Sequence, residues 1–208
     1  MTSHTAAPDP GSPEDPARRK RGCLVDLVET LLLTVVIFVG IQTFIAQPYK
    51  VEGSSMEATL QGNSYLLIDK LTPRWAAYQR GDIVVFHPPP DFGPAGVPFV
   101  KRVIGLPGDH IELRDGDVLV NGAALDEPYA FADGVQPRTE PLSETAEWVV
   151  PAGELFLLGD HRNRSEDSRA FGPIEISEVV GRAWLRYWPI ETLGIVAAPT
   201  YAVPRSPP

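Results

Sequence analysis

Two residues of this sequence could form a hydrolytic pair: Ser55, in a turn-like stretch at residues 53–60, and Lys101, in a short apolar segment. A serine hydroxyl attacks a carbonyl only when a base takes its proton, and lysine can be that base only when burial disfavours its charge. Lys101 is flanked by Phe99-Val100 and Val103-Ile104, so in a strand it alternates with apolar side chains. From the pattern alone, a turn-forming serine and a solvated strand lysine are the ordinary alternatives.

The other reactive side chains predict no competing chemistry. Cys23 is the single cysteine, which excludes an intrachain disulfide and a cysteine zinc cage. His87, His110 and His161 lie far apart, without the spacing of metal ligands or of a histidine triad. The net charge of −9 argues against nucleic acid as a partner, because phosphate binding needs a basic face. We therefore expect neither a metal nor a cofactor.

An apolar segment precedes the candidate pair. Residues 24–46 carry Asp26 and Glu29 near their start, are uncharged from Thr30 onward, and are long enough to span a bilayer. A cleaved signal peptide and a buried core helix are the alternatives. However, residues 44–48 make a poor cleavage site, and a buried helix would more often show a polar face. The basic cluster at residues 18–21 predicts a cytoplasmic N-terminus and export of everything after the span.

The sequence predicts four regions. Residues 1–23 are a cytoplasmic N-terminus, disordered at 1–17 because they are rich in Pro, Ser, Thr, Ala and acids, and residues 24–46 are the transmembrane helix. Residues 47–192 form the extracytoplasmic domain, and 193–208 are a proline-broken tail. We expect the domain to be mainly β, with no long helix.

Short apolar or alternating runs bounded by Gly, Pro or Asp predict the strands of this domain. They lie at residues 65–70, 82–87, 98–104, 155–158 and 179–188. Asp115-Gly116, between residues 110–114 and 117–120, predicts a hairpin turn. The acidic, weakly patterned residues 123–147 predict a surface excursion.

Four blocks in the same order resemble the bacterial type I signal peptidases of peptidase family S26, membrane-bound Ser-Lys proteases that remove signal peptides. They are PYxVxGxSMxxTL at residues 48–60, GDIVVF at 81–86, VKRVIGLPGD at 100–109 and GDHRNRSEDSRAFG at 159–172. With the N-terminal span, the resemblance covers most of residues 24–188. It implies a membrane-anchored serine endopeptidase with a β-rich catalytic domain after one transmembrane helix.

The resemblance also implies roles for individual residues. Ser55 would attack the scissile carbonyl, Lys101 would take its proton, and Ser165 would orient the lysine amine. The backbone N–H of Ser55 would bind the oxyanion. Charge pairing around the site would come from Arg102, Asp160, Asp167 and Arg169. An extended peptide would bind along a strand edge and be cleaved after small residues of the Ala-x-Ala type. Its pockets would be lined by Tyr49, Val51, Met56, Leu60, Phe99 and Val100, whose ordinary role is core packing.

Three positions depart from the family pattern. Gly53 stands where some members have a serine that serves as a second oxyanion donor, so the identity of that donor is open, with Ser54 as one candidate. Ala58 replaces a usual proline, which predicts a slightly looser turn. His161 replaces a usual asparagine and adds a titratable group.

The expected partners are the signal peptides of preproteins and the lipid bilayer, close to the secretion translocon. The expected location is the cell membrane, single-pass. Two rival functions share some of these features. A self-cleaving Ser-Lys repressor shares the dyad but is cytosolic. A membrane-anchored peptide-binding protein with a decayed site would lack an intact pair, whereas Ser55, Lys101, Ser165 and Asp167 are all present.

Overall fold

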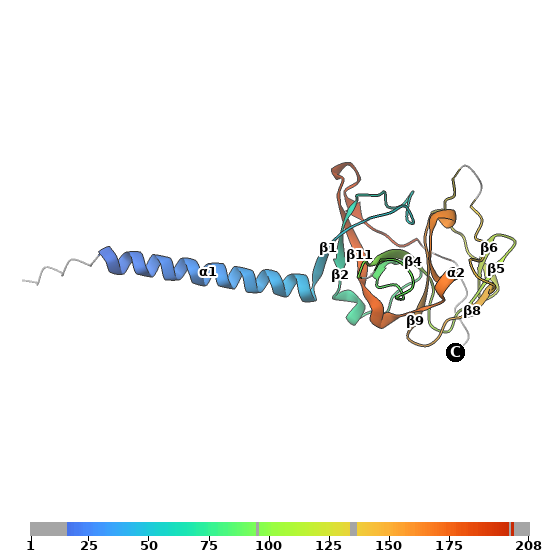
Figure 1. Ribbon diagram of the computed structural model, residues 1–208, viewed down its shortest axis with the longest axis horizontal. Coiled ribbons are helices and arrows are strands. Elements are labelled where there is room, and N and C mark those ends of the chain that lie inside the picture. The colour runs from blue at the N-terminus through green and yellow to red at the C-terminus, as the bar shows by residue number, and fades with distance from the viewer. Residues whose placement is uncertain (1–15, 95, 134–136, 200, 202–208) are drawn as a thin grey trace, which may run out of the picture. The chain divides into compact units, whose positions relative to one another are not determined.

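The computed structural model describes residues 16–94, 96–133, 137–199 and 201 of the chain. It divides into two compact units, Met1–Ile41 and Gln42–Pro208. Most of the helix α1, Pro16–Phe44, belongs to the first unit (Figure 1). Its part Gly22–Phe44 is long and apolar enough to cross a membrane, and none of its apolar window is buried, as expected of a span rather than a core helix. Residues 1–15, most of the segment expected to be disordered, lie outside the described part.

The second unit is built on an antiparallel, eight-stranded sheet (Figure 1). The sheet order is β1-β2-β11-β3-β4-β9-β10, with β12 paired to β11. The strands are β1 (Ala46–Lys50), β2 (Tyr65–Asp69), β3 (Ile83–Phe86), β4 (Phe99–Gly105), β9 (Glu154–Leu158), β10 (Ile174–Glu175), β11 (Val179–Trp188) and β12 (Gly194–Ile195). Strand β3 reads Ile-Val-Val-Phe and is buried throughout, since branched and aromatic side chains suit a strand covered on both faces.

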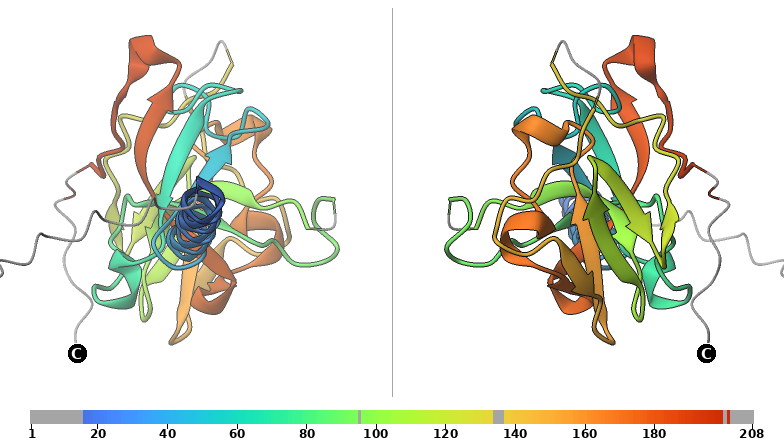
Figure 2. Two further views of the ribbon diagram at one scale, coloured as in Figure 1. Left: turned by 90° about the vertical axis from the view of Figure 1, so that its left-hand side faces the viewer. Right: turned by 90° about the vertical axis from the view of Figure 1, so that its right-hand side faces the viewer.

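A second, four-stranded sheet has the order β7-β6-β5-β8. Its strands are β5 (His110–Arg114), β6 (Asp117–Val120), β7 (Ala123–Ala124) and β8 (Glu147–Val149). Strands β5 and β6, yellow-green and facing the viewer on the right of Figure 2, form the predicted hairpin. Asp115 and Gly116 have φ angles of 57° and 92°, the left-handed conformation that a two-residue hairpin turn requires.

The expected mainly β architecture is confirmed. In the part of the chain that the structure describes, the helices after α1 are one short α-helix and four 3-10 turns. They are α2 (Ser168–Phe171), η1 (Thr72–Arg74), η2 (Arg162–Arg164), η3 (Ile176–Glu178) and η4 (Ile190–Thr192). The core forms three apolar clusters. The first contains Met56 and Leu60 with Ile68 and Val100, so it anchors the turn that carries Ser55 to the larger sheet.

Two segments are more integrated than the sequence indicated. Residues 123–147 are more than a surface excursion, because Leu125 is buried in the core and Glu127 pairs with the buried Arg162 at 2.6 Å. The described part of 193–208 is more than a tail. Strand β12 pairs with β11, and the Tyr201 hydroxyl bonds that of Tyr129 at 2.8 Å. Neither pairing follows a local periodicity, so a pattern-based interpretation of the sequence misses both.

Candidate active site

Ser55 lies in a compact turn that packs against the hydrophobic core. The amides of Glu57 and Leu60 donate to the carbonyls of Ser54 and Met56, at 3.0 and 2.7 Å. Met56 and Leu60 are each 1% exposed, so their burial fixes the turn. The carbonyl of Ser55 accepts a hydrogen bond from the backbone N–H of His161 at 3.0 Å. The block at residues 159–172 therefore contacts the serine directly.

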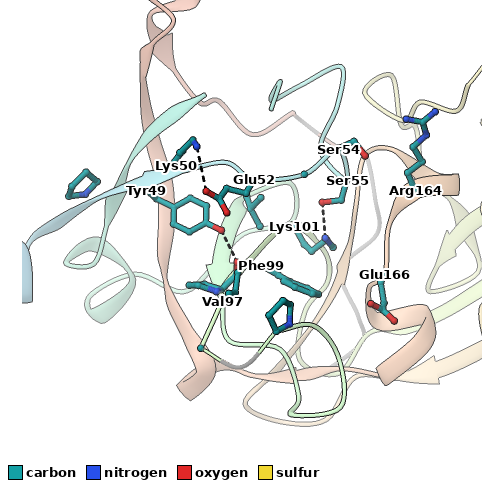
Figure 3. Close-up of a pocket in the computed structure, with 16 residues that line it drawn as sticks. Tyr49, Lys50, Glu52, Ser54, Ser55, Val97, Phe99, Lys101, Arg164 and Glu166 are labelled. Carbon is teal, nitrogen blue, oxygen red and sulfur yellow. Dashed lines mark hydrogen bonds and ion pairs between the residues drawn. The ribbon is translucent and has the colours of Figure 1, made fainter. Parts of the chain in front are cut away.

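Lys101 faces Ser55 from the middle of β4 (Figure 3). Its Nζ lies 2.8 Å from Ser55 Oγ and 5.0 Å from the centre of the Phe99 ring, and the residue is 3% exposed. Burial lowers the pKa of the Lys101 ammonium from 10.5 to about 8, and the charge of Asp167 opposes this only in part. The apolar neighbours of Lys101 were visible in the sequence, but the pattern alone left a solvated strand lysine open, and in the structure the side chain is buried.

Asp167 is the centre of a hydrogen-bond network within residues 159–169, the wall of the site that contacts the Ser55 turn. Its carboxylate accepts hydrogen bonds from Gly159 N–H at 3.0 Å, from Ser165 Oγ at 2.6 Å and from Arg169 Nε at 2.8 Å. It also caps α2. Since the Ser165 hydroxyl donates to Asp167, its lone pairs stay available to an amine. A Cβ on Gly159 would overlap Ser165 and lie 2.7 Å from the Ser55 carbonyl oxygen, so only glycine fits between them.

A second buried ion pair joins strands to this wall. The guanidinium of Arg102 binds Asp160 through Nε at 2.8 Å and Nη2 at 2.6 Å, and its plane lies 4.0 Å from the Tyr129 ring centre. Arg102 is 2% exposed and Asp160 fully buried, a placement that is tolerable only because the charges are paired. The structure therefore brings together every charged residue that the resemblance implied for the site.

A groove of about 630 Å³ passes over Ser55 and Lys101 (Figure 3). Among the expected pocket residues, Tyr49, Phe99 and Val100 line it. Val51, Met56 and Leu60 do not, because each is 1% exposed and packs in the core beneath the turn. Two further parts of the groove were not predicted to line it: Pro94, Gly96, Val97 and Pro98 on one side, and Arg164 and Glu166 on the other. The first part follows from the proline-rich composition of residues 88–98, and the second lies within the block at residues 159–172.

The three departures from the family pattern take defined positions. Gly53 has a φ angle of 105° and Ala58 one of 80°. A proline ring cannot adopt a positive φ, so the turn at Ala58 differs in backbone conformation rather than in tightness. Ser54 points towards the Arg164 side of the groove, away from Lys101 (Figure 3). His161 is fully buried behind the turn.

Known proteins match the chain over most of its length. Residues 24–188 match the family described as signal peptidase, peptidase S26. The chain is 38% identical over 177 residues to a probable signal peptidase I-2 of Synechocystis, covering 83% of this chain and 77% of that one. It is 35% identical to a signal peptidase I of Leptolyngbya laminosa, covering 96% and 98%.

A crystal structure of a signal peptidase I from Enterococcus faecalis is 34% identical, with a TM-score of 0.41, over 51% of this chain and 97% of that chain. The family match spans more than half of the chain, and both relatives above exceed 30% identity over more than two thirds of it. The chain therefore belongs to the signal peptidases of peptidase family S26, the hydrolases that remove signal peptides.

Proposed function

We propose that the chain cleaves signal peptides with Ser55 as nucleophile and Lys101 as general base. The observation that carries this proposal is the 2.8 Å contact between Ser55 Oγ and an Nζ atom whose pKa burial lowers to about 8. A neutral amine at that distance can accept the hydroxyl proton as the oxygen attacks the scissile carbonyl. Ser165, anchored by Asp167, orients the amine.

Three further proton transfers complete the reaction. The tetrahedral oxyanion accepts a hydrogen bond from the Ser55 backbone N–H, a donor worth about 3 kcal/mol of barrier. The Lys101 ammonium gives its proton to the leaving amine, the C–N bond breaks, and an ester of Ser55 remains. Lys101, neutral again, takes a proton from a water that attacks this ester. As the ester C–O bond breaks, the Lys101 ammonium gives this proton to Ser55 Oγ, which restores the hydroxyl, and the signal peptide leaves with a free carboxylate.

The groove supports binding of an extended peptide. Strand β1 is an edge of the larger sheet, and Pro48, Tyr49 and Lys50 of that strand line the groove. An edge strand offers unpaired backbone groups to a substrate that joins the sheet. The Tyr49 hydroxyl donates to the Pro98 carbonyl at 2.7 Å, which narrows the groove between the two walls. A shallow, narrowed groove favours small side chains, as in Ala-x-Ala sites.

Residues 24–46 would anchor the enzyme as a single-pass protein of the cell membrane, with residues 1–23 cytoplasmic and the 47–192 domain extracytoplasmic. The unburied apolar helix Gly22–Phe44 and the basic cluster at residues 18–21 support this. A translocating preprotein would then meet the site beside the bilayer and the translocon. A reporter enzyme fused after Pro208 is expected to lie outside the cytoplasm. A reporter found in the cytoplasm would contradict this orientation.

Cleavage of a purified precursor by the detergent-solubilised full chain tests the function. The wild type is expected to cut once, after a small residue, with the site read by mass spectrometry. Ser55→Ala is expected to reduce the rate by about 10⁴-fold or more, because alanine has no hydroxyl to attack the scissile carbonyl. A wild type that binds the precursor but does not cut it would instead indicate a peptide-binding protein with a decayed site.

A further inference from the structure

Four ionisable side chains lie in series behind the turn that carries Ser55. His161 Nδ1 lies 3.2 Å from Glu57 Oε2, in the turn, and its Nε2 lies 3.4 Å from Asp133 Oδ1. Asp133 in turn pairs with Arg164 at 2.6 Å, and Arg164 lines the groove (Figure 3). The mechanism proposed above uses neither the imidazole nor its two carboxylates.

The imidazole is fully buried although its two acidic partners are nearly half exposed, at 45% for Glu57 and 43% for Asp133. Nε2 makes no hydrogen bond; its contact with Asp133 is an ion pair by distance alone. A buried polar atom without a hydrogen bond requires an explanation. The Phe131 ring packs edge-on at 4.8 Å and closes the remaining side. The described part of the chain places no other charged side chain in contact with the ring.

Only one protonation state suits both neighbours. A neutral imidazole carries one N–H, so either tautomer turns the lone pair of its other nitrogen towards a carboxylate. In the imidazolium, Nδ1–H donates to Glu57 and Nε2 turns no lone pair towards Asp133. The series Glu57, His161, Asp133 and Arg164 then has strictly alternating charges. The backbone adds a third link, because the His161 N–H holds the Ser55 carbonyl at 3.0 Å.

We propose that His161 is a positioning residue for the nucleophile, a protonated clip that joins the Ser55 turn to the Asp133–Arg164 side of the groove. The clip rests on the proposed function, since its purpose is to hold Ser55 against Lys101. Loss of the imidazolium proton leaves Glu57 or Asp133 facing a nitrogen lone pair, and that contact of the clip is lost. An asparagine at this position makes neither charged contact and does not titrate.

The test compares wild type and His161→Asn in precursor cleavage by the full chain between pH 5.5 and 9. Losing charge-assisted contacts is expected to lower kcat by about tenfold at pH 6, with KM little changed. Once the imidazole has lost its proton, the two enzymes are expected to agree within about twofold, because neither side chain then carries the charge that the clip needs. A rate ratio that stays constant across this range, or equals one throughout, overturns the proposal, because a purely structural role is independent of pH.

Two sets of variants sharpen the comparison. Glu57→Gln and Asp133→Asn should each reproduce part of the loss at pH 6 and add little to His161→Asn. His110→Asn is the matched control, since that half-exposed histidine pairs with Glu147 at 3.5 Å on the smaller sheet. It is expected to leave the pH profile unchanged. Full additivity of the Glu57 and His161 variants would contradict a shared clip.

A spectroscopic measurement keeps the proposal falsifiable without catalysis. In ¹⁵N-histidine-labelled full chain, the His161 resonances are assigned by their loss in His161→Asn. At pH 6 both ring nitrogens are expected to carry protons, and Glu57→Gln or Asp133→Asn should remove one. A singly protonated His161 ring at pH 6 overturns the clip even if the wild type cleaves. Absence of wild-type cleavage would overturn the proposed function, while the labelled ring still decides the clip.

Discussion

Lys101→Met removes cleavage activity by about 10⁴-fold in the expected result, because methionine fills the same buried space without a basic nitrogen. Single-turnover cleavage of a precursor measures this loss separately from binding. Lys70→Met is the matched control, since Lys70 is a partly exposed strand-end lysine that donates to Gln47 at 3.4 Å, away from Ser55. Appreciable activity in Lys101→Met, or a comparable loss in Lys70→Met, would remove Lys101 from the mechanism.

The same lysine predicts the pH dependence of the wild type. An ammonium cannot accept the Ser55 proton, so only the neutral fraction of Lys101 is active. With the Lys101 pKa at about 8, kcat/KM is expected to fall nearly tenfold for each pH unit below that value and to level off above it. A profile that is flat from pH 6 upward would show that another group sets the rate.

Removing Lys101 should raise stability while it abolishes activity. Because burial lowers the Lys101 pKa from 10.5 to about 8, the unfolded chain binds a proton more tightly between these values. The folded state therefore carries a penalty that is complete below about pH 8 and fades towards pH 10.5. At about 1.4 kcal/mol per pKa unit, Lys101→Met should raise the free energy of unfolding by about 3 kcal/mol at pH 7. Denaturant unfolding at pH 7 and 10 checks both the gain and its decline.

Asp167→Asn is expected to lower the free energy of unfolding by about 3–5 kcal/mol, the usual effect of breaking a buried ion pair. Asn keeps the shape but leaves the Arg169 guanidinium, 2% exposed, without its counter-charge. It also turns an amide N–H₂ towards Ser165 or Arg169, both of which donate to Asp167. The wall holding Ser165 should shift, and kcat should fall with it.

Thermal unfolding of the detergent-solubilised chain measures this effect. Glu147→Gln is the control, because it removes only the exposed ion pair with His110, and its effect should stay below about 0.5 kcal/mol. If Asp167→Asn unfolds at the same temperature as the wild type, the buried network does not stabilise this part of the fold as the geometry indicates.

Local patterns were sufficient for most of the fold. Five alternating or branched runs, at residues 65–70, 82–87, 98–104, 155–158 and 179–188, predicted strands of the larger sheet, and Asp115-Gly116 predicted the hairpin. These succeed because strand burial and turn geometry leave a period or a residue type in the sequence. Strand β1 was missed, since Ala46–Lys50 directly follows the apolar helix and contains a proline.

The proposed Ser55–Lys101 pair and the ion pairs around it could be predicted for a different reason. Lys101 shows an apolar alternation, but its partnership with Ser55, 46 positions earlier, has no local signature and came from the resemblance. Contacts with neither pattern nor motif were missed, such as Glu127 with Arg162 and Gly93 packed against the Phe99 ring. The groove wall formed by Pro94, Gly96, Val97 and Pro98 is another contact of this kind. Such contacts depend on how loops meet in space, which periodicity does not encode.

The most direct test is the mass of the enzyme caught during turnover. The wild type is mixed with a peptide ester or precursor peptide, quenched in acid and digested. An acyl adduct is expected on the peptide that contains Ser55, retained on Ser55 in Ser54→Ala and absent from Ser55→Ala. An adduct on any other residue, or turnover without Ser55, would contradict the assignment of Ser55 as the nucleophile.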